Sequence, residues 1–163
     1  MGLDMYLNAE RFLWSYPEDG PDAQVAKTVK EMMPELAGVD TAKVQTITAE
    51  VGYWRKANQI HNWFVKNVQD GVDECEPHDV SREQLIALRD TCQKVLDDNT
   101  LADTLLPTGA GFFFGGTDYD EWYFKDVERT VQVCNDVLEQ FFTQKLDDGT
   151  VYSQWEIKYC SSW

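Results

Sequence analysis

Hydrophobic and polar residues alternate in three separate parts of the chain, and a period of two is typical of β-strands that bury one face. Residues 2–8 show this pattern at the start of the chain, and residues 151–160 show it at the end. Residues 43–52 carry the strongest strand signal, because they are rich in β-branched side chains and Gly52 marks a natural end. We therefore expect three strands near these positions.

A period of 3.6 residues predicts about four helices between the strands. The first is expected over residues 23–36, with Pro34 ending or distorting it because proline lacks the backbone N–H that a helix needs. The second is expected to be a long helix over residues 53–69. Ser81 begins the third, with Gln84 three residues later as a capping box requires. The buried stripe of the second helix is expected to contain Tyr53, Ala57, Ile60, Phe64 and Val68.

The fourth helix is expected over roughly residues 120–145, with Thr117 or Asp118 as its N-cap. The expected buried stripes of the last two helices are Leu85, Leu88, Cys92, Val95 and Leu96, and Tyr123, Val127, Val131, Cys134, Leu138 and Phe141. Strands at the start, middle and end predict an α+β fold, in which about four helices pack on a small, mostly antiparallel sheet. A chain of 163 residues without a repeat or linker is expected to form one domain, residues 1–163.

Acidic residues outnumber basic ones by 29 to 14, which gives the chain a net charge of −15. A field of that sign repels phosphate backbones, so we expect no direct binding to nucleic acid. The same field attracts positively charged protein surfaces, and it also keeps a protein soluble whatever its function. Because hydrophobic residues still make up 43% and aromatic residues 13% of the chain, we expect it to fold around a core.

Several features of the sequence indicate a cytoplasmic protein that does not enter a membrane. No apolar stretch approaches the ~18 residues of a membrane span, and the first residues lack the basic region of a signal peptide. The four cysteines are far apart and form no Cys-x-x-Cys pair, so we predict neither disulfides nor a zinc site. We expect no metal and no organic cofactor.

Residues 53–64 hold the densest group of side chains suited to ligand binding. On the expected helix, Trp54, Asn58 and His61 are spaced by four and three residues, which places an indole, an amide and an imidazole side by side. Such a set could stack on a ring and bind its edge, or orient His61 as a general acid or base. Alternatively, Asn58 and His61 only satisfy neighbouring backbone groups. Arg55 is a weaker candidate, because a cation in the first turn of a helix needs an anionic partner.

A second group of candidates lies at the start of the fourth helix, after Gly115 and Gly116. A glycine loop before a helix N-terminus can wrap an anion with its backbone N–H groups. The acidic residues at this end would repel phosphate unless a metal ion intervened, and they could instead simply cap the helix. The two groups together predict one ligand site, made of Trp54, Arg55, Asn58, His61, Tyr119, Asp120 and Trp122.

Distinctive motifs run from one end of the chain to the other. They are MGLDMYL at 1–7, EVGYWRKAN at 50–58, IHNWFV at 60–65, GFFFG at 111–115, YDEWY at 119–123 and SSW at 161–163. With these motifs the chain resembles a family of small uncharacterised proteins encoded by bacteriophages and prophages. The resemblance implies phage origin and expression in the cytoplasm of a bacterial host. It implies no activity, so no catalytic residue is carried over. It is weakest over 15–40 and 97–105, where we predict no site.

Two functions are compatible with these features. The first is that of a non-enzymatic phage accessory protein, a host-interaction or counter-defence factor, which binds and inhibits a host protein with a basic surface through its own acidic surface. The alternative is a small-ligand or nucleotide-binding protein, or an enzyme, whose site joins residues 53–63 to residues 115–123. The first predicts carboxylates gathered on one face, and the second predicts a concave aromatic pocket with convergent polar groups. A structural phage component is a third class that the acidic composition supports little.

Overall fold

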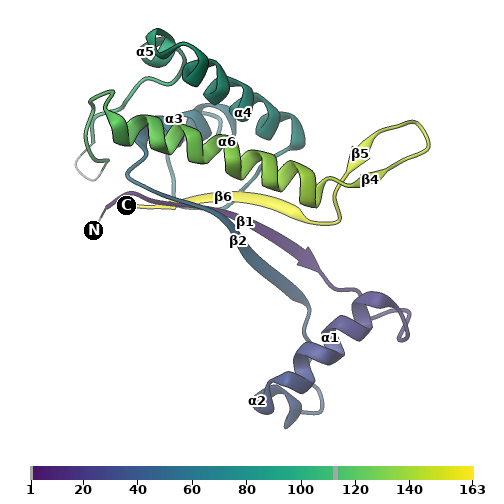
Figure 1. Cartoon of the computed structure of the whole chain (residues 1–163). Helices are drawn as coiled ribbons and strands as arrows, with labels where there is room; N and C mark the ends of the chain where they lie inside the picture. The colour runs from purple at the N-terminus through teal and green to yellow at the C-terminus, as the bar shows by residue number, and fades with distance from the viewer. Residues whose placement is uncertain (1, 112–113) are drawn as a thin grey trace. The chain divides into compact units, whose positions relative to one another are not determined.

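The computed structural model describes residues 2–111 and 114–163 (Figure 1). Phe112 and Phe113 of the GFFFG motif lie outside the described residues. The chain has the predicted α+β fold. Its longer elements are β1 (Asp4–Phe12), α1 (Pro21–Met32), β2 (Thr46–Arg55), α3 (Asn58–Asn67), α4 (Arg82–Asp97), α6 (Glu121–Phe141) and β6 (Glu156–Ser162). The short ones are α2 (Pro34–Ala37), β3 (His78–Asp79), η1 (Asn99–Leu101), α5 (Ala102–Leu105), β4 (Gln144–Lys145) and β5 (Val151–Tyr152).

The described residues form two compact units. The larger unit takes in the described part of residues 1–9 and 50–163, and the smaller unit is residues 10–49. Strands β1 and β2 contribute residues to both units, because each of them crosses a boundary. The single domain over residues 1–163 stays a prediction.

Four strands form the main sheet, in the order β2-β1-β6-β3, and the sheet is mostly antiparallel as expected. β3 pairs antiparallel with β6, so that His78 lies opposite Tyr159. The acidic residues around Pro77 predict a loop, so the sequence does not predict the two-residue edge strand β3.

The expected strand over residues 151–160 is divided in two. Its first part, β5, pairs with β4 in a separate hairpin, and only β6 joins the main sheet. Between the two parts the backbone N–H of Trp155 donates to Oγ of Ser153 at 2.9 Å. A serine hydroxyl that binds the backbone two residues on stabilises a local turn, and this turn interrupts the strand.

The core of the larger unit lies between one face of the sheet and helices α3, α4 and α6 (Figure 1). Met5 and Leu7 of β1 and Leu3 just before it are fully buried, while the residues between them are half-buried, as the alternation predicts. The buried side chains from the helices include Ile60, Phe64, Leu85, Leu88, Cys92, Val95, Tyr123, Val127, Cys134 and Val137. Both cysteines of the expected stripes are therefore buried in the core, and burial raises the pKa of the Cys134 thiol to about 12.

The helix termini test the capping predictions. Ser81 caps α4, and the reciprocal bonds with Gln84 that form a capping box are both present. The predicted caps of the last helix are wrong, because Asp120 takes this role and accepts the backbone N–H of Tyr123 at 3.0 Å. A carboxylate at that position also complements the helix dipole. None of the helices in the described residues is long and apolar enough to span a membrane.

The second predicted helix starts too early. Residues 53–55 continue strand β2, and α3 begins only at Asn58. Lys56 separates the two elements with a φ of 61°, in the left-handed region that a helix cannot contain. The aromatic residues Tyr53 and Trp54 suit a pleated, half-buried surface, and the strand extends through them.

The smaller unit contains α1 and α2, which are separated at Pro34 as predicted. No residue of either helix is buried. Two apolar side chains of α1 are exposed instead, Met32 at 76% and Val25 at 43%. Within residues 10–49, Leu13 is the buried hydrophobic residue.

Candidate functional site

The larger unit has a polar cleft of about 330 Å³. One wall is the end of β2 and the start of α3, and the other is the loop before α6 together with the first turns of that helix. Four of the seven predicted site residues line it: Arg55, Asn58, Asp120 and Trp122. The other lining residues are Lys56, Gln59, Thr108, Gly115, Gly116, Asp118, Tyr123 and Asp126.

Two cations occupy the β2 side of the cleft. The Arg55 side chain is 63% exposed, and its Nε lies 3.8 Å from a carboxylate oxygen of Asp4, too far for a strong ion pair. The next residue, Lys56, adopts the left-handed conformation that side-chain-bearing residues rarely take. Its backbone is fixed there by the bond from its N–H to the carbonyl of Leu3, at 2.7 Å. Since Lys56 is also exposed, both positive charges are available to a ligand.

Gly115 makes this arrangement of Lys56 possible. A Cβ added to Gly115 would lie 3.0 Å from Cβ of Lys56 and 3.2 Å from the Lys56 carbonyl oxygen, and Gly115 itself has a φ of +88°. A larger residue would meet both a steric and a conformational penalty. The glycine therefore lets the loop pass directly over the lysine.

Asn58 holds that loop in place. Its amide nitrogen donates to the carbonyl oxygens of Phe114 and Gly116, each at 2.9 Å, and its amide oxygen accepts the N–H of Gly109 at 2.9 Å. The side chain is 1% exposed. This is the backbone-satisfying role that the sequence leaves open for Asn58, and three such bonds leave little of the amide for a ligand.

Carboxylates and an indole line the opposite side of the cleft. Asp118 and Asp120 lie at or before the start of α6, where acidic side chains are favoured by the helix dipole. Trp122 is 71% exposed, and Nζ of Lys125 lies 4.6 Å from the centre of its ring. An exposed indole at the rim of a charged cleft offers a face for a planar or cationic group.

Asp126 is the carboxyl group with the most altered acidity in the cleft. Burial raises its pKa to about 6, and Asp120 adds a smaller rise, while Arg129 opposes both. Asp126 follows Trp122 by four residues on α6, so the two side chains share a helix face. A carboxyl group that titrates near pH 6 changes the charge of the cleft close to neutral pH.

Replacement of Asp126 by asparagine is expected to stabilise the chain at pH 7.5. The folded-state pKa of about 6 lies above the ordinary value of 3.8, so the folded chain binds this proton more tightly than the unfolded chain. Protonation of Asp126 therefore stabilises the folded chain. This stabilisation is fully present below about pH 4 and is lost as the pH rises through 6. Because solvent reaches this carboxyl group, we expect D126N to gain about 1 kcal/mol at pH 7.5 and nothing at pH 4. Urea unfolding at both pH values measures the difference, and an equal effect at both would contradict the assignment.

Three predicted site residues do not line the cleft. Trp54 is 2% exposed, and its indole nitrogen donates to Oγ1 of Thr130 at 2.9 Å inside the core. Tyr119 lies next to the cleft, where its hydroxyl accepts the N–H of Thr108 at 3.4 Å. His61 is fully buried and therefore cannot exchange protons with a ligand in the cleft.

His61 instead belongs to a polar network that joins α3 to β6. Its Nδ1 lies 2.8 Å from the hydroxyl of Tyr159, and its Nε2 lies 3.1 Å from an oxygen of Asp73, although that second contact lacks the angle of a hydrogen bond. Burial raises the pKa of Tyr159 well above its usual range, with the charge of Asp73 adding to the rise. A phenol that keeps its proton can donate to Nδ1, which leaves the ring hydrogen on Nε2, facing Asp73.

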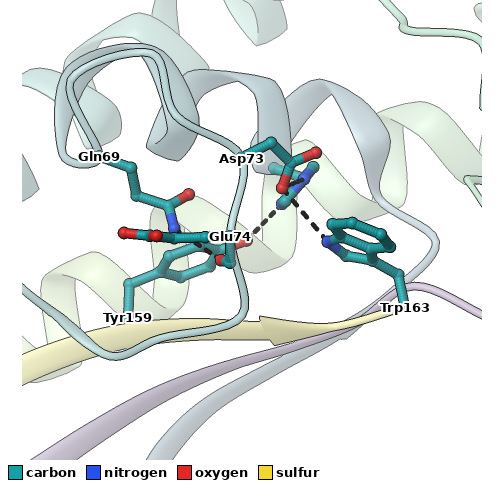
Figure 2. A network of polar contacts seen from close by, with 6 residues as sticks. Gln69, Asp73, Glu74, Tyr159 and Trp163 are labelled. Atoms are coloured by element: carbon teal, nitrogen blue, oxygen red, sulfur yellow. Dashed lines mark hydrogen bonds and ion pairs between the residues drawn. The ribbon is translucent and has the colours of Figure 1, made fainter.

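The same network ties the C-terminal strand to the loop that follows α3. Figure 2 shows Tyr159 and Trp163 on the C-terminal segment, with Asp73 across from them, and the indole nitrogen of Trp163 donates to Asp73 at 3.2 Å. Gln69 donates to the carbonyl oxygen of Glu74 at 2.9 Å and closes the loop. These contacts give His61 a structural role.

Eight lining residues are absent from the predicted site, among them the charged residues Lys56 and Asp126. Lys56 follows the predicted site residue Arg55 directly. On the expected helix, neighbouring residues point to different faces, so Lys56 would not have joined Arg55 in one site. Asp126 carries a detectable signal, because its spacing of four from Trp122 places both on one face of a predicted helix. In residues 2–111 and 114–163, no group of three or more His, Cys, Asp or Glu side chains is arranged to hold a metal ion.

The fold and the cleft define an α+β protein with a polar cleft that carries both signs of charge. No protein-family model, curated protein or solved structure matches the chain.

Proposed function

We propose that the protein binds a small ligand in the cleft of its larger unit. The ligand carries a planar, amino-bearing or cationic group at one end and a single anionic group at the other. The observation that supports this proposal most is the division of charge in the cleft, with Arg55 and Lys56 on one side and Asp118, Asp120 and Asp126 on the other.

The chemistry of each side suits one end of such a ligand. The planar group stacks on the exposed indole of Trp122 and donates hydrogen bonds to the neighbouring carboxylates. The anionic group is held by Lys56 and Arg55, of which Arg55 can bind a carboxylate or phosphate with two parallel hydrogen bonds. A multiply charged anion alone is disfavoured, because three carboxylates line the same cleft.

The hypothesis that an acidic surface binds a basic host protein stays a prediction from the sequence. Phage origin, the bacterial cytoplasm and a counter-defence role stay predictions with it. Of the net charge of −15, the smaller unit contributes −3, from seven acidic and four basic residues, so the remaining −12 belongs to the larger unit. The negative electrostatic field of the larger unit favours a ligand that carries a cationic group.

Isothermal titration calorimetry with defined probes tests the proposal. L-arginine and adenosine monophosphate carry both kinds of group, agmatine carries only the cationic end, and inorganic phosphate carries only the anionic end. We expect at least one two-ended probe to bind more tightly than either single-ended probe. Trp122→Ala and Lys56→Gln should each weaken that binding by about 10-fold, which corresponds to about 1.4 kcal/mol.

Matched variants outside the cleft provide the controls. Trp14→Ala removes another exposed indole, at 68%, and Lys94→Gln removes an exposed lysine on α4. Both should leave the affinity unchanged. The proposal fails if none of the probes binds, if the single-ended probes bind as tightly as the two-ended ones, or if the control variants weaken binding as much as the cleft variants.

A further inference from the structure

The smaller unit, residues 10–49, is too poorly packed to be stable as an isolated structure. α1 has 12 residues and no buried side chain, and α2 has four residues and none. Helices of this length are marginal in water unless an apolar face packs against something. A unit with one buried hydrophobic residue gains little from burial against the entropy of ordering 40 residues. The unit therefore has apolar surface that a partner can cover.

A groove along α1 is the part of this surface with a defined shape. It has a volume of about 210 Å³. Its floor is made mostly of small or aliphatic side chains, so it has room for a large apolar side chain from outside. The lining residues are Leu13, Ser15, Ala23, Ala26, Lys27, Lys30, Ala42, Lys43 and Val44.

The charge of the groove is opposite to that of the chain. Three lysines line it and no carboxylate does, although the chain as a whole has a net charge of −15. Lys43 has no polar partner among the described residues. Nζ of Lys27 lies 3.9 Å from Glu31, and Nζ of Lys30 donates to the carbonyl oxygen of Asp40 at 3.1 Å. These lysines keep much of their charge available to a partner.

The unit's own carboxylates do not fill the groove. Asp22 accepts hydrogen bonds from the Arg11 guanidinium and from the backbone N–H of Trp14, and it is not among the residues that line the groove. The same segment carries two exposed aromatic side chains, Trp14 at 68% and Tyr16 at 85% exposure. Aromatic residues of this kind are enriched at the energetic centres of protein interfaces.

We infer that the smaller unit is a docking surface for an acidic, amphipathic segment of a partner protein. Apolar side chains of that segment enter the groove, and its carboxylates pair with Lys27, Lys30 and Lys43. The net charge of the whole chain predicts a partner with a basic surface, whereas this groove fits a partner segment that is acidic. A second copy of the chain is a poor occupant, because a twofold contact along α1 would bring the lysines of both copies together. Docking also completes the packing of α1.

Fluorescence anisotropy with the full chain and three labelled helical peptides tests this inference. The peptides share one leucine face over about 16 residues, long enough to form a helix, and carry Glu, Gln or Lys at the remaining positions. We expect the Glu peptide to bind at least about 10-fold more tightly than the Lys peptide at low salt, and this ratio should shrink as salt is added. Hydrogen exchange of α1 should slow when the Glu peptide binds.

Charge variants locate the binding. Lys27→Gln with Lys43→Gln should weaken the Glu peptide about 10-fold, and Lys27→Glu with Lys43→Glu should reverse the order of the Glu and Lys peptides. Lys94→Gln with Lys145→Gln changes the net charge equally, at exposed positions of the larger unit, and should have no effect. The inference is overturned if the three peptides bind equally or not at all, or if the control pair has the same effect. It is also overturned if sedimentation equilibrium shows self-association that the Lys27 and Lys43 variants abolish, since a second copy would then occupy the groove.

Discussion

Replacement of Phe64 by alanine is expected to lower the free energy of unfolding by about 3–5 kcal/mol, the usual cost of deleting a buried aromatic ring. Phe64 is fully buried, and its ring stacks on that of Tyr159 with 3.9 Å between centroids and 7° between planes. This stack joins α3 to β6 across the centre of the larger unit. Truncation leaves a cavity and also removes the ring contact, which contributes beyond area burial.

Urea unfolding measures this effect as a lower midpoint with an unchanged slope. Phe64→Leu keeps most of the apolar volume and should lose only about 1–2 kcal/mol. Leu146→Ala, at a side chain that is 52% exposed, is the matched control and should change the stability by less than about 0.5 kcal/mol. A loss below about 1 kcal/mol for Phe64→Ala would show that the stacked ring does not support the core.

Elements whose signals are local could be predicted from the sequence. α4 is the clearest case, because its start depends on Ser81 and Gln84 and its buried stripe on a regular period. β1 is similar, since its alternation matches the buried positions residue by residue through Leu7. In these segments propensity, capping and hydrophobic pattern all favour one structure, so no distant contact is needed to choose it.

The boundary between β2 and α3 shows why other predictions failed. From Tyr53 onward the apolar residues fit a helical period, but these same aromatic residues also suit a strand. The strand extends because Lys56 donates its N–H to Leu3, a residue more than fifty positions earlier in the chain. A backbone bond over that distance leaves no local signal. The error placed Trp54 on a helix surface, whereas the structure buries it against Thr130.

The cleft could be predicted only in part for the same reason. The sequence identifies the two segments that form it, because both are dense in polar and aromatic side chains. It does not show which side chains face outward, since this depends on where β2 ends. The sequence also does not predict the raised pKa of Asp126, because that rise comes from burial in the folded chain. The smaller unit is harder still, because its missing core becomes visible only when the positions of α1 side chains are known.

Asn58→Ala is expected to destabilise the larger unit by roughly 2–4 kcal/mol, because three hydrogen bonds of about 1 kcal/mol each are lost and their buried backbone partners are left unpaired. These partners are the carbonyl oxygens of Phe114 and Gly116 and the N–H of Gly109. All three belong to the loop that forms one wall of the cleft. The amide hydrogen of Gly109 should therefore exchange faster in the variant, while the amide hydrogens in the centre of α4 change only in proportion to global stability.

Asn58→Asp separates the role of the donor from that of the acceptor. An aspartate still accepts the N–H of Gly109, but at neutral pH it presents an oxygen where the amide nitrogen donates to two carbonyl groups. We expect N58D to be at least as destabilised as N58A at pH 7.5 and to recover as the pH falls, since a protonated carboxyl group can donate again. Asn67→Ala, at an exposed asparagine in the last turn of α3 whose amide donates to the carbonyl oxygen of Trp63, is the control and should cost less than about 1 kcal/mol. If N58D is as stable as the unchanged chain at pH 7.5, the amide donor of Asn58 does not hold the loop.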